Sequence, residues 1–290
     1  SEAGAAQLQI RLASEGLEIP SEIEWDWHWR LPSDEVFMSV ARDDRDCLLL
    51  FPDSMTVRFL AEDRIVEVAP TETVSGTTVR HLLLDHVLPR LVSQEGRLVL
   101  HAAAVAHRDG VVLFLGQTGR GKSTLSASFR AAGHELLTDD CILLDPGDGG
   151  YRAIPAYPGL RLWADSAAVF AEDSDSPDET EVGAWKKRLE VLPSSGENLA
   201  VRALFLLEPP ARSTEVATVE VTRIEGAAAM TDLMPHGFML DPSDRATIER
   251  HFASTGGLAG ALPLFRVSYP REFSRLAEVR EAIELALEGL

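Results

Sequence analysis

VVLFLGQTGRGKSTLSASFRAAG, from Val111 to Gly133, is the stretch of sequence that decides the fold. Its opening apolar run is typical of a buried strand, and the residues from Lys122 onward predict a helix that ends at Gly133. Between them, Gly116-x-x-x-x-Gly121-Lys122-Ser123 matches the pattern of a phosphate-binding loop. A strand that leads through such a loop into a helix predicts an α/β fold with a phosphate site at the loop.

The residue types in this loop suit a nucleotide. Its glycines let successive backbone N–H groups turn toward phosphate oxygens, and the helix start adds the positive end of its dipole. Lys122 would neutralise the β- and γ-phosphates of ATP, and the Ser123 hydroxyl would be a ligand of Mg²⁺. We therefore expect the following residues to bind ATP: Gly116, Gln117, Thr118, Gly119, Arg120, Gly121, Lys122, Ser123 and Thr124.

Two adjacent acids, Asp139 and Asp140, follow in HELLTDDCILLD, residues 134–145, which predicts one further strand. Acids inside an apolar strand are costly unless something compensates them. Neighbouring strand residues point to opposite faces, so we expect two roles. One carboxylate would hold Mg²⁺ and the other would accept a proton from an attacking hydroxyl. The alternative is a solvated strand end.

His101 lies in RLVLHAAAVAH, residues 97–107, which predicts a single buried strand, and it can be a structural or a catalytic residue. The basic run after the acidic stretch is either a solvated face or a lid that brings positive charge to the transferring phosphate. Further, weaker candidates for phosphate or substrate contacts are single residues elsewhere. The basic run comprises Lys186, Lys187 and Arg188, and the weaker single candidates are Arg161, His236 and Arg266.

The pattern of short apolar runs predicts two domains, residues 1–96 and 97–290. The first is a small β-rich unit that ends in a helix over residues 78–96, with Pro89 at a kink or in the last turn. The second is the catalytic domain, with helices predicted over 241–253 and 271–290. The acidic stretch 171–183 has no large apolar residues other than Val182 and predicts a mobile loop.

The composition excludes several classes of partner. With 27 basic and 46 acidic residues the net charge is −19, which disfavours nucleic acid and anionic membranes. Two cysteines far apart in the sequence do not form a disulfide framework, and no apolar run is long enough to span a bilayer. We expect a cytoplasmic protein without a signal peptide; the sequence is compatible with a homo-oligomer.

LHAAAVAHRDGVVLFLGQTGRGKSTLSASFRAAGHELLTDDCILLD, residues 100–145, resembles the catalytic core of the HPr kinase/phosphorylase family. The resemblance implies a P-loop kinase core of the HPr kinase and phosphoenolpyruvate-carboxykinase type, with a mixed sheet, that transfers phosphate from ATP to serine. By position His101 matches the family's active-site histidine and Asp139-Asp140 its acid pair. The resemblance assigns proton acceptance to Asp139 and places Asp140 nearer the metal.

The chain as a whole is similar to the shorter HPr-kinase-like proteins of lasso-peptide and related peptide-tailoring clusters. YPGLRLW, KKRLEVLP and RVSYPREFSRL carry that likeness, which implies a peptide or small protein as partner, with the C-terminal serine of a precursor peptide as acceptor. Thr124 stands where HPr kinases have Glu, so HPr itself is not the expected substrate.

A phosphate loop also occurs in proteins with three other functions. A kinase for a small metabolite would use the same core with a different acceptor pocket. A non-catalytic nucleotide-binding regulatory module would have no use for a proton acceptor beside the loop. A GTPase would carry an Asn-Lys-x-Asp element, which this sequence lacks. The sequence therefore predicts an ATP- and Mg²⁺-dependent serine kinase, with the metabolite kinase and the regulatory module as alternatives.

Overall fold

The computed structural model describes residues 8–14, 16–108, 110–147, 149–155, 162–170, 179–182, 185–188, 199–209 and 218–290. The chain divides into two compact units. The N-terminal unit comprises Ser1–His86 together with Leu240–Ile248, and the core unit comprises Val87–Met239 with Glu249–Leu290. The division therefore falls at His86 rather than at residue 96, and a short later segment belongs with the N-terminal unit.

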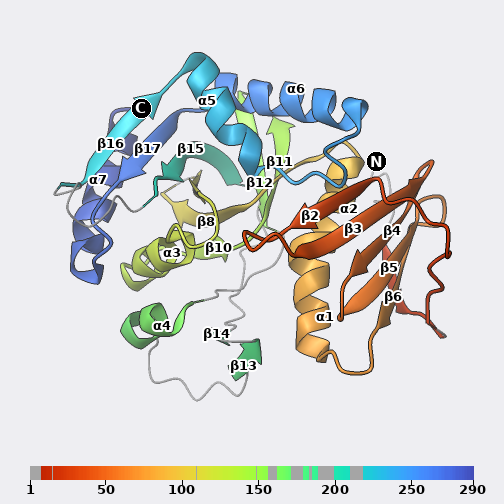
Figure 1. The fold of residues 1–290 in the computed structure, drawn as a ribbon. Helices are drawn as coiled ribbons and strands as arrows, with labels where there is room; N and C mark the ends of the chain where they lie inside the picture. Colours follow the sequence, from red (N-terminus) through yellow and green to blue (C-terminus); the bar gives the residue numbers. More distant parts are fainter. Residues whose placement is uncertain are drawn as a thin grey trace, which may run out of the picture. The chain divides into compact units, whose positions relative to one another are not determined.

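A mixed sheet forms the N-terminal unit (Figure 1), and six of the described strands belong to it, in the order β1-β6-β5-β4-β3-β2. The strand β1 runs parallel to β6, and the other pairs are antiparallel. Alternate residues of β4 and β5 are buried, as expected for strands with one covered face. The strands are β1 (Gln9–Leu12), β2 (Trp27–Arg30), β3 (Val36–Asp43), β4 (Asp46–Phe51), β5 (Met55–Leu60) and β6 (Ile65–Pro70).

The helical segment predicted over residues 78–96 is in three parts. Helix α1 (Gly76–Leu82) begins at Ser75, whose hydroxyl accepts a hydrogen bond from the Thr78 N–H. A π-helical turn, Leu83–Val87, follows, and then α2 (Leu88–Gln94). Pro89 lies at the start of α2, directly after the π-helical turn, so it is inside a continuous helical run in which its missing N–H cannot donate to a preceding carbonyl. The prediction that Pro89 marks the last turn is therefore wrong.

A second mixed sheet forms the core unit. Among the described residues, its path runs β10-β8-β9-β15-β12-β11-β7, with β17 beside β15 and β16 beside β17. The central strands β9, β15 and β17 are parallel to one another. The strands are β7 (Leu98–Leu100), β8 (Ala102–His107), β9 (Gly110–Leu115), β10 (Leu136–Thr138), β11 (Ile142–Gly147), β12 (Gly150–Pro155), β15 (Leu199–Leu207), β16 (Glu220–Ile224) and β17 (Leu264–Ser268).

Helices cover both faces of this sheet, so the core unit has three layers (Figure 1). On β9, Val112 and Phe114 pack with α3 and α7, while Val111 and Leu113 pack with α5 and α6 on the other face. The helices are α3 (Lys122–Ala131), α4 (Ala164–Phe170), α5 (Gly226–Leu233), α6 (Arg245–Ala261) and α7 (Leu276–Glu288). Short 3₁₀ turns lie at Met234–His236 and Phe273–Arg275.

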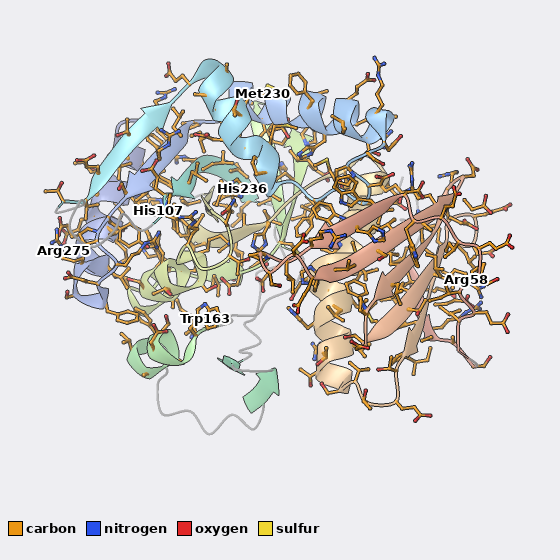
Figure 2. The ribbon with its side chains drawn as sticks, in the orientation of Figure 1. Arg58, His107, Trp163, Met230, His236 and Arg275 are labelled. Atoms are coloured by element: carbon orange, nitrogen blue, oxygen red, sulfur yellow. The ribbon has the colours of Figure 1, made fainter. Side chains whose placement is uncertain are left out.

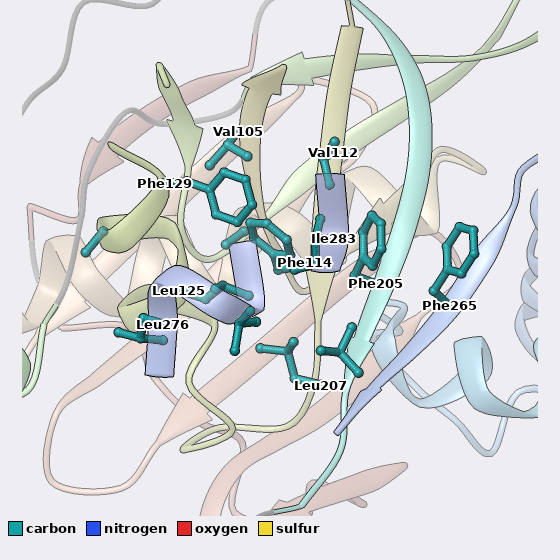
Figure 3. Packing of buried hydrophobic residues seen from close by; sticks show 14 of the residues in the cluster. Val105, Val112, Phe114, Leu125, Phe129, Phe205, Leu207, Phe265, Leu276 and Ile283 are labelled. Atoms are coloured by element: carbon teal, nitrogen blue, oxygen red, sulfur yellow. The ribbon is translucent and has the colours of Figure 1, made fainter. Parts of the chain in front are cut away.

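Aromatic side chains fill the layer between the sheet and helices α3 and α7 (Figure 3). Phe114, Phe129 and Phe205 are fully buried, and Phe114 has ring contacts with both others. Truncating such a residue to alanine costs about 3–5 kcal/mol. This packing holds β9 and α3 rigidly on either side of the loop between them.

Two stretches that were each predicted to form one strand are interrupted. Residues 97–107 form β7 and β8, and the break is at His101, whose N–H donates to the carbonyl of His236 over 2.7 Å. Residues 134–145 form β10 and β11, and Asp139 and Asp140 lie in the bend between them. The breaks arise because β8 and β10 pair with each other while β7 pairs with β11.

The other predicted segments agree in part with the structure. The helix predicted over 241–253 extends from Arg245 to Ala261, and the helix predicted from Arg271 begins only at Leu276. In the acidic stretch, residues 171–178 lie outside the described residues, while β13 (Glu179–Val182) pairs with β14 (Trp185–Arg188). No described helix is both long and apolar enough to cross a lipid bilayer.

Candidate active site

The candidate site lies at one edge of the core-unit sheet, where several strands end or begin. The parallel strands β9, β15 and β17 place their carboxyl ends there, which is where ligands bind in open α/β sheets. The antiparallel β8 begins opposite the end of β9, since Ala102 pairs with Leu115, so His101 comes to the same edge. Strand β10 ends beside Ala104, which brings the acid pair there too.

The loop from Gly116 to Gly121 connects β9 to α3 and contains three glycines with positive φ. Gly119 has φ 81° and Gly121 has φ 88°, in the left-handed region that side chains disfavour. A Cβ on Gly121 would lie 2.4 Å from Nη1 of Arg271, whereas a Cβ on Gly119 would meet no atom within 4 Å. An alanine at position 121 would therefore be strained in its backbone and would also displace the guanidinium of Arg271.

Lys122, the first residue of α3, is 6% exposed and bridges two parts of the site. Its Nζ donates to the carbonyl oxygen of Gly116 over 2.7 Å and lies 2.9 Å from Nε2 of His101. The His101 Nδ1 lies 2.8 Å from the carbonyl oxygen of Asp140. A carbonyl only accepts, so Nδ1 carries the proton and Nε2 accepts from the lysine. His101 is thus a neutral bridge between Lys122 and the acid pair.

The electrostatics agree with this assignment. Burial, followed by the charge of Lys122, lowers the pKa of His101 to about 4, so the imidazole is neutral at physiological pH. Burial also lowers the pKa of Lys122, and the charges of Asp139 and Asp140 oppose that shift. Both carboxylates therefore lie close enough to support the ammonium of Lys122.

The two acids have different surroundings. Asp139 is 1% exposed, while Asp140 is half-buried and lines the cavity beside the loop. The Thr138 hydroxyl donates to the carbonyl of Cys141 over 2.9 Å and closes the bend that separates them. A ligand in the cavity thus meets Asp140, although the sequence led us to assign proton acceptance to Asp139.

Arg271, which sequence reasoning missed, holds the loop from the end of β17. Its guanidinium donates to the carbonyl of Arg120, to the Tyr269 hydroxyl over 2.8 Å and to the carbonyl of Glu208 over 2.6 Å. It therefore connects the carboxyl ends of all three parallel strands. Burial lowers the pKa of Arg271, which nevertheless stays charged because arginine titrates far above neutrality.

A cavity of about 410 Å³ opens between these elements. Its polar wall consists of the loop and its surroundings: His101, Thr118, Gly119, Gly121, Lys122, Ser123, Thr124, Asp140, Asp165, Ser166, Arg271 and Glu272. Its apolar wall comprises Leu162, Trp163, Tyr269, Phe273 and Leu276. The volume is in the range of a site for one small ligand. Most of the apolar wall was not predicted, because only the folded chain brings α4 and the segment after β17 to the loop.

Mg²⁺ fits the oxygen donors of this cavity. The Ser123 hydroxyl and the Asp140 carboxylate both line it, and Mg²⁺ prefers oxygen ligands, with few from the protein and the rest from phosphates and water. Among the described residues, no three His, Cys, Asp or Glu side chains are grouped to hold a metal by themselves. The ion would offset the negative charge of the phosphates.

The remaining candidates lie at varying distances from the cavity. Gly116, Gln117 and Arg120 belong to the loop but do not line the cavity. His236, labelled in Figure 2, is buried; its carbonyl holds the backbone of His101, and burial followed by the charge of Lys122 lowers its pKa to about 4. Arg266 instead pairs with Glu208 and Asp232. Arg161 and the side chains of Lys186, Lys187 and Arg188 lie outside the described residues.

Comparison with known proteins gives a distant likeness among solved structures. No protein-family model and no curated protein matches the chain. Among solved structures, the Hpr(Ser) kinase/phosphatase from Coxiella burnetii aligns with 66% of this chain and 98% of its own, with 14% sequence identity and a TM-score of 0.34. A likeness at this level carries no conclusion about individual residues, so the function is argued from the site.

Proposed function

We propose that this protein is an ATP- and Mg²⁺-dependent kinase that transfers the γ-phosphate to a serine hydroxyl of a peptide or small protein. The observation that carries the proposal is the chain of contacts from Lys122 through His101 to Asp140, on the wall of the cavity that the loop also lines. A phosphate-binding cation, loop amides and a carboxylate share one cavity, which is what phosphoryl transfer requires.

In this proposal the residues divide the work by position. The loop amides and Lys122 hold the phosphates and stabilise the negative charge that spreads over the transferring group. The acceptor oxygen attacks the γ-phosphorus, the bond to the bridging oxygen of ADP breaks, and the hydroxyl proton passes to a carboxylate. We assign proton acceptance, together with the contact with Mg²⁺, to the carboxylate of Asp140, which lines the cavity. We assign the support of the Lys122 charge to the buried Asp139.

His101 acts as a positioning residue. It is neutral and donates through Nδ1, so it is not the base that takes the acceptor proton. Its Nε2 accepts one of the three hydrogens of the Lys122 ammonium, and the Gly116 carbonyl accepts another. These two contacts fix the orientation of the ammonium group, so its third hydrogen can be donated to a phosphate oxygen.

The acceptor comes from the sequence resemblance, which favours a peptide, with the C-terminal serine of a lasso precursor as the specific candidate. The test is transfer of labelled phosphate from ATP to a set of peptides that end in serine, each matched with a peptide that ends in alanine. We expect Mg²⁺-dependent label on the serine peptides, and none with Lys122→Ala protein.

The alternatives give different results in the same assay. Transfer of label to small hydroxylated metabolites but to no peptide would show that the acceptor is a metabolite. Tight ATP binding without transfer to any acceptor would favour a regulatory nucleotide-binding module. Failure to bind ATP at all would contradict the kinase proposal in every form.

A further inference from the structure

Two large aromatic side chains stand partly exposed on the cavity wall. Trp163 is 36% exposed and Phe273 is 39% exposed, while Leu162 and Leu276 on the same wall are buried. Trp163, labelled in Figure 2, immediately precedes α4, and Phe273 begins the 3₁₀ turn that precedes α7. Aromatic side chains that are partly exposed on a cavity wall are suited to a flat ligand, because they offer apolar area with little rotamer freedom to lose.

Contacts hold both aromatic residues in fixed places relative to the phosphate loop. Thr124 lies in α3, two residues after Lys122, and its hydroxyl is 2.9 Å from the Ser166 hydroxyl of α4. The ring of Phe170, at the other end of α4, lies 6.3 Å from the ring of Phe273. Helix α4 therefore touches both α3 beside the loop and the turn that carries Phe273.

The polar end of the cavity determines which part of a nucleotide would reach these rings. Lys122 contacts His101, and His101 contacts Asp140, so this group marks the place of the γ-phosphate. Beyond the loop, on the side of Thr124, the wall carries Trp163 and Phe273 together with polar residues. The polar residues there are Asp165, Ser166, Arg271 and Glu272. A nucleotide with its terminal phosphate at Lys122 would then extend its nucleoside toward Trp163 and Phe273.

We propose that Trp163 and Phe273 form a stacking platform for the base of the phosphoryl donor. The inference rests on the proposed function, which it deepens by naming the residues that select a nucleotide over a simple polyphosphate. Stacking on an aromatic side chain is tolerant of which base is bound, because every base has a π-face. The platform accordingly contributes affinity for a nucleoside, while the loop supplies the affinity for phosphate.

The test compares two ligands that differ only in the nucleoside. Binding of ATP and of tripolyphosphate, each with Mg²⁺, is measured by titration calorimetry with the full-length protein. We expect Trp163→Ala and Phe273→Ala each to weaken ATP binding about tenfold and to leave tripolyphosphate binding unchanged. Trp163→Phe should retain most of the ATP affinity, since it keeps an aromatic face.

Trp27 provides the matched control, because it has the same 36% exposure but lies on β2 of the N-terminal unit. Trp27→Ala should change the affinity for neither ligand, and Lys122→Ala should weaken the binding of both ATP and tripolyphosphate. Equal losses for ATP and tripolyphosphate in Trp163→Ala, unchanged ATP binding, or a loss confined to the acceptor peptide would each overturn the platform. Wild-type protein that binds neither ligand would instead contradict the proposed function itself.

Discussion

The Nζ of Lys122 lies 2.9 Å from Nε2 of His101, so the lysine that follows the phosphate loop is coupled to the residue directly before β8. The same imidazole contacts the backbone carbonyl of Asp140 through Nδ1. One ring therefore connects the loop after β9 to the bend after β10. The charge of Lys122 and the protonation of His101 depend on each other, and this dependence can be measured.

Replacing Lys122 should raise the pKa of His101. Burial is the largest cause of its low value of about 4, and the positive charge of Lys122 is the second. Lys122→Met removes that charge, so the pKa should move upward while remaining below 6.5, because burial persists. A titration of the ring nitrogens by NMR checks this. Lys122→Arg keeps the charge and should leave the pKa low; a value unchanged in Lys122→Met would show that the two groups are not coupled.

The two acids should respond differently to the same substitution. Asp140→Asn should reduce transfer by about 100-fold or more with little change in stability, because this half-buried carboxylate faces the cavity. Asp139→Asn removes a buried charge near Lys122 and should lower the free energy of unfolding by about 3 kcal/mol. Transfer assays and urea unfolding measure both effects. An inactive but stable Asp139→Asn beside an active Asp140→Asn would return proton acceptance to Asp139.

Gly121→Ala and Gly119→Ala form a matched pair in the loop. Both glycines have φ above 80°, so either alanine costs about 1–2 kcal/mol in backbone strain. Only the Cβ on Gly121 would meet Arg271, at 2.4 Å, so Gly121→Ala should lose more stability and weaken ATP binding further. Combining Gly121→Ala with Arg271→Ala should cost less than the sum of the two single changes. Strictly additive unfolding free energies would show that Arg271 does not restrict residue 121.

Stability should depend on pH through His236. Burial, followed by the charge of Lys122, lowers the pKa of this residue from 6.5 to about 4, so between these values the unfolded chain binds a proton that the folded chain does not. The stabilisation is complete above pH 6.5 and is lost as the pH falls toward 4, by about 3 kcal/mol in all. The His236→Asn variant lacks this pH-dependent part of the free energy of unfolding. The difference in free energy of unfolding between wild type and variant should therefore shrink as the pH falls. Urea unfolding on both sides of pH 6.5 measures it, and a difference that does not vary with pH would contradict the shift.

Local patterns predicted the elements around the loop correctly. The apolar run of β9, the three glycines and the helix from Lys122 to Ala131 are encoded within one short stretch, so backbone preferences and hydrophobic period were sufficient. The β-rich character of the N-terminal unit was predicted for a similar reason, since β3 to β6 are each a short apolar run between turn residues, whereas β1 and β2 were not predicted.

The strand breaks at His101 and at Asp139-Asp140 could not be predicted in this way. Residues 98–107 are a continuous apolar run apart from two histidines, and nothing local marks where pairing with β11 ends and pairing with β9 begins. The break depends on which strands are neighbours, and that is set by contacts between segments far apart in the sequence. Arg271 was missed for the same reason, because its partners Arg120 and Glu208 are distant in the chain.

The sequence by itself determined that a phosphate loop joins a strand to a helix, because glycine conformations and apolar spacing act over neighbouring residues. The tertiary structure decided how that loop is used. It placed His101 against Lys122, buried Asp139 while leaving Asp140 on the cavity wall, and brought Trp163, Arg271 and Phe273 to the loop. These are consequences of sheet order and of burial, and both are properties of the whole folded chain.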